Sequence, residues 1–288
     1  MVGHPSLGII GAGKVGTALA VLLSRSGCEV RTVFSRTEAN GRRLAEVIGA
    51  QTTPSAAAAA EGADLILLTV PDDSIEAVAL GLQDVDWTGK GAVHTSGALD
   101  ASCLEALAAR GAMTGSFHPV FPFASLEQSL AGLPGAAFAI ETRSPVLHDW
   151  LGGLAEAIGS SWFDVPGDKK ALYHCALVMA SNYLVTLYAV AEQMLAALGV
   201  EPTAIRRALN TLVQGTADNL RDQGIPLALT GPLTRADAGT VRSHLRALAS
   251  YDRDVMALYR MLAQLTVPVV AQRGLPTEWI ETLINQEE

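Results

Sequence analysis

The chain has 288 residues, 49% of them hydrophobic and 17% charged, so it can bury a large core and is not expected to be disordered. Its net charge is −9 and basic residues occur at most two in a row, which excludes the basic stripe that binds nucleic acid. The three cysteines (Cys28, Cys103 and Cys175) are far apart, which favours reduced thiols in a cytoplasmic protein over disulfides or a metal site.

The first 165 residues alternate between short apolar runs and helical patterns. Strands are predicted at Leu7–Ile10, Glu29–Phe34, Leu65–Val70, Ala92–Thr95, Ala112–Phe117, Ala136–Ile140 and Trp162–Val165. Amphipathic helices are predicted between the early strands, for example at Val15–Ser26 and Glu38–Ile48. Because strands that alternate with helices form parallel sheets, we predict an α/β fold, with a doubly wound Rossmann domain over residues 1–165.

After Val165 the pattern becomes helical to the end of the chain. Helices are predicted at Lys169–Leu198, Thr203–Leu220, Thr234–Ala249, Asp252–Gln272 and Thr277–Gln286, which make an all-α domain over residues 166–288. The stretch from Ala171 to Ala191 has no charged residue but contains several polar ones. We interpret it as a buried helix of a soluble protein rather than as a membrane span.

A glycine-rich turn follows the first predicted strand. Gly11 suits the tight turn, Gly13 allows the backbone to approach a pyrophosphate, and Gly16 allows the helix to pack against the sheet. Lys14 and Val15 open that helix, whose free N–H groups attract phosphate. The position after a strand and before an apolar helix favours a dinucleotide site over an ordinary glycine-rich turn.

The end of the second strand predicts which dinucleotide is bound. An NAD site has Asp or Glu here for the ribose, whereas this chain has Ser35, Arg36 and Thr37. Hydroxyls and a guanidinium suit a 2′-phosphate, so we predict NADP as the cofactor. The alternative is that Arg36 is an ordinary surface residue and Glu38 binds the ribose.

Later strand ends carry further candidates, because ligands bind at the carboxyl edge of such a sheet. Thr69, Val70, Pro71 and Thr95 are predicted to flank the cofactor. Ser96 and His118 are predicted to position the substrate, although a histidine at a strand end can also be purely structural.

Polar residues also share one face of the first long C-terminal helix. At 100° per residue, Lys170, His174 and Ser181 lie together, with Asn182 beside them. On a buried helix such groups need partners, which are either one another or a substrate. We predict that Lys170 donates a proton, that His174 and Asn182 polarise a carbonyl group, and that Ser181 contacts the substrate.

Together these segments resemble a family that joins a Rossmann-like domain to a C-terminal domain of formerly unknown function. The matching segments are Gly8 to Gly16, His94 to Leu99, Gly115 to Pro119, Lys170 to His174, Ala180 to Tyr183 and Leu229 to Pro232. The resemblance implies a relation to 6-phosphogluconate dehydrogenase-like, pyrroline-carboxylate reductase-like and ketopantoate reductase-like enzymes. It also implies dimerisation through the helical domain.

The resemblance leaves the proton donor open. Ketopantoate reductases look similar in using a Lys and an Asn on these helices, and Lys170 matches that Lys. The chain departs from the pattern four residues later, where it has His174.

The leading hypothesis is therefore hydride transfer between NADPH and a small carbonyl compound, such as the 2-oxo acid ketopantoate. The enzymatic alternative is reduction of a cyclic imine such as pyrroline-carboxylate. A non-catalytic NADP-binding or sensor protein is the alternative from another class. We expect a homodimer in the cytoplasm, with a small-molecule substrate and no nucleic-acid or membrane partner.

Overall fold

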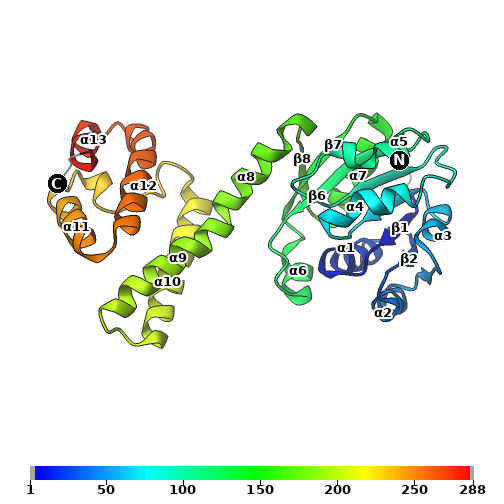
Figure 1. Ribbon diagram of the computed structural model, residues 1–288, viewed down its shortest axis with the longest axis horizontal. Helices are drawn as coiled ribbons and strands as arrows, with labels where there is room; N and C mark the ends of the chain where they lie inside the picture. Colours follow the sequence, from blue (N-terminus) through cyan, green and yellow to red (C-terminus); the bar gives the residue numbers. More distant parts are fainter. Residues whose placement is uncertain (1–3, 286–288) are drawn as a thin grey trace. The chain divides into compact units, whose positions relative to one another are not determined.

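The computed structural model describes residues 4–285, which form two compact units (Figure 1). The first unit ends at Asn182 and the second begins at Tyr183. This boundary comes later in the chain than Val165, where the sequence pattern changes, because the helix that begins after Val165 contacts the sheet of the first unit.

The first unit is built on one eight-stranded sheet with the order β3-β2-β1-β4-β5-β6-β7-β8. Its strands are β1 (Leu7–Ile10), β2 (Val30–Phe34), β3 (Gln51–Thr52), β4 (Leu65–Leu68), β5 (Gly91–His94), β6 (Met113–Val120), β7 (Ala137–Thr142) and β8 (Ser161–Asp164). All neighbours are parallel except β6 and β7. The first six strands have the Rossmann order, which confirms the predicted fold class.

Helices cover both faces of this sheet. They are α1 (Lys14–Arg25), α2 (Glu38–Ile48), α3 (Ala56–Glu61), α4 (Asp72–Leu80), α5 (Glu105–Ala108), α6 (Leu126–Gly132) and α7 (Pro145–Ala157), with short turns η1 (Ala101–Leu104) and η2 (Gly167–Lys169). The next helix, α8 (Lys170–Ala180), contacts the sheet through its first turn. Side-chain oxygens of Ser55, Ser125 and Ser144 cap α3, α6 and α7, so these helices begin where the sequence supplies an acceptor.

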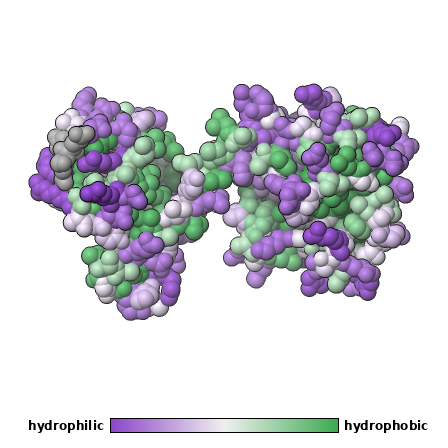
Figure 2. All heavy atoms as spheres, viewed as in Figure 1, coloured by the Kyte–Doolittle hydropathy of each residue, from purple (hydrophilic) through white to green (hydrophobic). Residues whose placement is uncertain are grey.

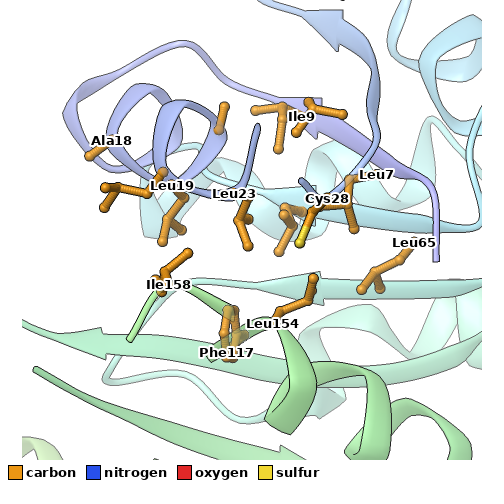
Figure 3. Packing of buried hydrophobic residues seen from close by; sticks show 14 of the residues in the cluster. Leu7, Ile9, Ala18, Leu19, Leu23, Cys28, Leu65, Phe117, Leu154 and Ile158 are labelled. Carbon is orange, nitrogen blue, oxygen red and sulfur yellow. The ribbon is translucent and has the colours of Figure 1, made fainter. Parts of the chain in front are cut away.

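Alternate residues of each strand supply two separate cores. Leu7, Ile9 and Phe117 face one core together with residues of α1, α2 and α7, part of which is drawn in Figure 3. Ile10 and Ile66 face the other core with α3, α4 and α5. Every one of these five side chains is at most 2% exposed, so the sheet is sealed on both sides where these helices lie.

The beginning of α8 lies on the second face, over β6 and β8. The Tyr173 ring packs edge-on against His118 of β6 and against Phe163 of β8. Because Phe117 faces the first core, its neighbours Ser116 and His118 point to the α8 side. The first turn of α8 therefore lies at the carboxyl edge of the sheet, where the predicted site is located.

The second unit is helical. It contains most of α9 (Asn182–Ala197), then α10 (Pro202–Gln223), the turn η3 (Leu233–Arg235), α11 (Ala238–Tyr251), α12 (Arg253–Ala271) and α13 (Glu278–Ile284). Val241, Leu245 and Val270 are buried between α11, α12 and α13. This organisation confirms the predicted helical C-terminal region, although the predicted end of the last helix at Gln286 lies outside the described residues.

Two expectations about the long helix Lys169–Leu198 were wrong. The helix is interrupted at Ser181, which separates α8 from α9. Apart from Lys170, no residue of α8 or α9 is buried, whereas the sequence predicted a buried helix. By length and composition, the segments Gly167–Ala197 and Arg253–Ala271 could each cross a membrane.

Candidate active site

The glycine turn after β1 has a structure that requires glycine at positions 11 and 16. Gly11 has a φ of +113°, in the region that favours glycine. A Cβ on Gly16 would lie 2.1 Å from the Gly11 carbonyl oxygen and 2.3 Å from the Thr69 hydroxyl. Gly13, in contrast, has nothing within 4 Å of the position of a Cβ. The turn is therefore closely packed at Gly11 and Gly16 and open at Gly13.

The N-terminus of α1 suits an anion. Its cap residue Gly13 has no side chain to accept from the first N–H groups, and its first turn contains no acidic residue. These N–H groups and the positive end of the helix dipole can thus serve a pyrophosphate. The Thr69 hydroxyl donates to the Gly11 carbonyl at 2.6 Å, so Thr69 braces the turn. Lys14 Nζ donates to the carbonyl of Ala124 at 2.9 Å, and Val15 packs against the first core.

The segment after β2 has a cation at its surface. Arg36 and Thr37 are exposed, and Ser35 is half-buried. Within residues 4–285, Arg36 makes no hydrogen bond or ion pair, whereas Glu38 pairs with Arg42. A free guanidinium beside two hydroxyls fits a 2′-phosphate. Glu38, the alternative ribose ligand, is already paired.

The buried ammonium of Lys170 lies at the centre of a polar network. Lys170 is 2% exposed, and its Nζ donates to Ser116 Oγ at 3.0 Å and to the Ser96 carbonyl at 3.4 Å. Burial lowers the pKa of Lys170, while the carboxylates of Glu141 and Asp100 act in the opposite direction. The ammonium therefore links the first turn of α8 to Ser96, just after β5, and to Ser116 in the middle of β6.

Carboxylates complete this network from two sides. Ser116 Oγ donates to Glu141 Oε2 at 3.2 Å, across the antiparallel pair of β6 and β7. The backbone N–H of Ala101 donates to Glu141 Oε1 at 3.0 Å. On the other side, Ser96 Oγ donates to Asp72 Oδ2 at 2.6 Å. Each of the two serines that contact the ammonium is therefore hydrogen-bonded to a carboxylate, Ser116 to Glu141 and Ser96 to Asp72.

His94 has a structural role in this network. The N–H of Ser96 donates to His94 Nδ1 at 3.2 Å, so the ring proton lies on Nε2, which faces the Asp100 carbonyl at 3.2 Å. Burial, followed by the charge of Lys170, lowers the pKa of His94 to about 4. The neutral ring supports the loop from Ser96 to Asp100.

His118 and Tyr173 form a second pair beside the ammonium. His118 Nδ1 and the Tyr173 hydroxyl share a hydrogen bond of 2.6 Å. Burial and the charges of Lys170 and His174 lower the pKa of His118 to about 4, and burial raises the pKa of Tyr173 to about 12. Both groups are therefore neutral at pH 7. A Cβ on Gly97 would lie 2.7 Å from His118 Nε2, so the ring packs directly on this glycine.

The structure brings together only some of the residues that the sequence indicated. Ser96 and Lys170 share a hydrogen bond, His118 pairs with Tyr173 beside them, and the half-buried Thr95 adjoins Ser96. Val70 is half-buried and Pro71 exposed after β4, beside Thr69. Along α8 and α9, His174 is half-buried, and Ser181 and Asn182 are exposed without a side-chain hydrogen bond in the described part of the chain.

Ser116, Glu141 and Tyr173 were missed as site residues. Ser116 precedes His118 in the same strand-end cluster, so the sequence contained a signal for it. Glu141 reaches the site only because β7 runs antiparallel to β6, which the sequence pattern does not reveal. Tyr173 falls within an apolar helix and carries no comparable signal.

Comparison with sequence families assigns both parts of the chain. The family model of a Rossmann-like domain matches residues 3–119. The model of a domain of unknown function (DUF2520) matches residues 136–266 and therefore includes β7, β8 and α8. A comparison with curated protein sequences gave no match.

Solved structures share this fold over nearly the whole chain. Protein TM1727 of Thermotoga maritima is 26% identical, with a TM-score of 0.76 and coverage of 93% of this chain and 99% of the other. Protein BF3122 of Bacteroides fragilis, assigned as an NADP oxidoreductase, is 26% identical, with a TM-score of 0.68 and coverage of 90% and 96%. A pyrroline-5-carboxylate reductase of Coxiella burnetii is 15% identical, with a TM-score of 0.65 and coverage of 98% and 99%, so it shows the fold alone.

Proposed function

We propose that this chain, a Rossmann-like protein with a DUF2520 domain, is a reductase that transfers hydride from NADPH to a small carbonyl substrate. The observation that carries the proposal is the buried ammonium of Lys170, fastened to the carboxyl edge of a dinucleotide-binding sheet. Ligands of such sheets bind at this edge. The likeness to the Bacteroides fragilis protein assigned as an NADP oxidoreductase supports the same reaction class.

The cofactor site follows from the open glycine turn. The N–H groups at Gly13 and the start of α1 hold the pyrophosphate, and Gly11 and Gly16 keep the turn compact. Arg36 binds the 2′-phosphate, with Ser35 and Thr37 as hydrogen-bond partners. Val70, Pro71 and Thr95 line the path from this end of the cofactor to the substrate.

Reduction of a carbonyl group needs one proton besides the hydride that NADPH supplies. Lys170 donates that proton to the carbonyl oxygen. Burial excludes water from the ammonium, which strengthens its interaction with charge that develops on this oxygen. Ser96 and His118 position the substrate, with His174, Ser181 and Asn182 as further contacts from α8 and α9. The substrate class is a 2-oxo acid such as ketopantoate.

A cyclic imine is the second candidate substrate, and the acidic surroundings of Lys170 favour it. Asp72, Asp100 and Glu141 all act on the ammonium. A protonated imine is a cation that such carboxylates would stabilise, and it needs no strongly acidic donor. A 2-oxo acid, in contrast, is an anion and would rely on Lys170 for charge.

A homodimer explains the exposed apolar helices. Leu172 on α8 and Val185 on α9 are 71% and 70% exposed. Figure 2 shows hydrophobic residues, in green, on the outside of α8. Surfaces of this kind mark contacts with other molecules, and we propose a second copy of the chain, in the cytoplasm, as the partner.

A substrate panel tests the reductase. NADPH consumption is followed with ketopantoate, other 2-oxo acids and 1-pyrroline-5-carboxylate. We expect turnover of one class, and a loss of kcat of about 100-fold or more in Lys170→Met. Lys169→Met is the matched control, because Lys169 is exposed and, within residues 4–285, its ammonium pairs only with Asp168, at 3.0 Å.

Three outcomes of the panel are informative. Turnover of the imine alone selects the second candidate. Tight NADPH binding without turnover of any compound indicates a sensor protein and contradicts the proposal. Equal activity of Lys170→Met and wild type removes the role of Lys170.

A further inference from the structure

We propose that Ser116 and Glu141 form a relay that returns protons from solvent to the ammonium of Lys170. The proposal rests on the proposed function, in which Lys170 gives up one proton in each turnover. It assigns a positioning and proton-transfer role to two residues outside the sequence-predicted site.

A relay is needed because Lys170 is buried and must regain a proton after each turnover. Lys170 is 2% exposed, so its amine cannot regain a proton directly from bulk water. Its Nζ has two hydrogen-bond partners in the described chain. The Ser96 carbonyl only accepts, and it cannot pass a proton on. The Ser116 hydroxyl is both donor and acceptor, so any relay through the protein starts there.

Glu141 continues the path beyond Ser116. The chain of atoms runs from Lys170 Nζ to Ser116 Oγ at 3.0 Å and on to Glu141 Oε2 at 3.2 Å. The Ala101 N–H holds the other carboxylate oxygen. Gly167 leaves room for that oxygen, because a Cβ there would lie 2.4 Å from Glu141 Oε1. The carboxylate is therefore held in place by backbone on two sides.

The path ends in open space. Glu141, Asp100 and Gly167 line a cavity of about 1160 Å³ that lies on one side of the network, whereas Lys170 does not line it. The cavity is large enough for many water molecules. Glu141 is half-buried and so bridges the sealed ammonium and the solvent.

The proton balance of the relay is simple. After Lys170 has protonated the substrate oxygen, its neutral amine takes the hydroxyl proton of Ser116. The Glu141 carboxylate takes a proton from water in the cavity and passes it to Ser116 Oγ, which replaces the proton that Ser116 gives to the amine. The net change is one proton from solvent for each substrate reduced, and no other reactant is consumed.

The other groups around Lys170 do not offer this route. The ammonium lies over the ring of Tyr173 of its own helix, 5.4 Å from the ring centroid. The other groups that interact with its charge are Asp72 of α4, His94 of β5, Asp100 before η1, Cys103 of η1 and His118 of β6. None of these is hydrogen-bonded to Nζ in the described chain. His94 faces backbone groups at both ring nitrogens.

The test measures proton exchange at Lys170 directly, without turnover. In protein labelled with ¹⁵N at lysine side chains, NMR gives the exchange rate of the Nζ protons with water, and Lys170→Met identifies the signal. We expect Ser116→Ala and Glu141→Gln to slow this exchange about 10-fold or more. Glu105→Gln is the matched control, because Glu105 lines the same cavity and is outside the network. It should leave the rate unchanged.

Further variants and readouts keep the test decisive. Ser116→Thr keeps the hydroxyl group and should exchange protons at the wild-type rate. Gly167→Ala should slow the exchange, because it displaces Glu141. These two variants test the relay even if Ser116→Ala does not fold. In the active enzyme, Ser116→Ala should lower kcat, leave KM unchanged and increase the solvent isotope effect. Exchange that is equally fast in the folded variants and wild type overturns the relay. A wild type without turnover overturns the proposed function instead, and the exchange rates still decide the relay.

Discussion

At the scale of single residues, we propose that Arg36 determines which dinucleotide is bound. It is exposed, it has no partner within residues 4–285, and it follows β2 where the ribose of a dinucleotide is bound. Its neighbours Ser35 and Thr37 add hydroxyl groups without adding negative charge. This segment can therefore accept a 2′-phosphate, which NAD lacks.

Arg36→Ala should weaken NADPH binding about 10- to 100-fold and leave NADH binding nearly unchanged, because it removes charge-assisted hydrogen bonds to the 2′-phosphate. Fluorescence titration with each dinucleotide measures both affinities. Arg42→Ala is the control, since Arg42 lies on the following helix α2 and pairs with Glu38. An equal loss of NADPH and NADH affinity in Arg36→Ala would argue against this role.

Two histidines whose pKa is lowered in the folded chain make stability depend on pH. The pKa of both His94 and His118 is lowered to about 4 in the folded chain, whereas an unfolded histidine titrates near 6.5. Between these values the unfolded state binds more protons than the folded state. The free energy of unfolding should therefore fall as the pH drops from about 6.5 to about 4, by up to about 1.4 kcal/mol per pH unit for each ring.

Urea unfolding of wild type and His118→Gln at several pH values between 4.5 and 7.5 measures this dependence. The variant lacks one of the two rings and should show a shallower slope below pH 6.5. Identical slopes in the two proteins would mean that His118 is not held neutral by the fold.

At the scale of elements, two glycines of the turn between β1 and α1 are expected to have different roles, one in stability and one in cofactor binding. Gly16 is enclosed by the Gly11 carbonyl and the Thr69 hydroxyl, whereas Gly13 faces open space. Two chemically identical substitutions in one turn should thus have different effects.

Gly16→Ala should destabilise the fold by about 1–3 kcal/mol or more, because its Cβ overlaps backbone. Gly13→Ala should keep the melting temperature and weaken NADPH binding about 10-fold or more, because its Cβ occupies the space of the pyrophosphate. Thermal unfolding and NADPH titration of both variants give the comparison. Tight binding by a folded Gly13→Ala would show that the pyrophosphate does not approach this turn.

Local patterns in the sequence were sufficient to predict much of the α/β half. The range Glu38–Ile48 was predicted to the residue, because its periodicity ends at a glycine in the left-handed conformation. β3 was missed because it has only two residues, both exposed. The site was less predictable, since Glu141 joins it through a reversed strand and Lys170 points to the sheet instead of along a polar stripe.

At the scale of the whole molecule, the apolar helices were the main failure of sequence reasoning. A helix that is apolar all round was expected to be buried, yet α9 has no buried residue in the single chain. Hydropathy reports that a surface avoids water, but it does not report whether the same chain or another one covers it. A second copy of the chain is the partner we propose.

Size-exclusion chromatography with light scattering should give twice the mass of the chain for the wild type. Val185→Glu places a charge on the exposed face of α9 and should shift the protein towards monomer at the same concentration. Val47→Glu is the control, because Val47 is similarly exposed, at 65%, but stands on α2. A monomeric wild type at micromolar concentrations would contradict the dimer.

We propose that one bound dinucleotide extends from the glycine turn to the network of Lys170. A crystal structure with NADPH tests it most directly. We predict that the pyrophosphate lies at Gly13, the 2′-phosphate at Arg36, and the nicotinamide C4 close enough to Ser96 and Lys170 for a substrate oxygen to reach the ammonium. A nicotinamide that points into solvent while Lys170 stays sealed beneath α8 would contradict the account.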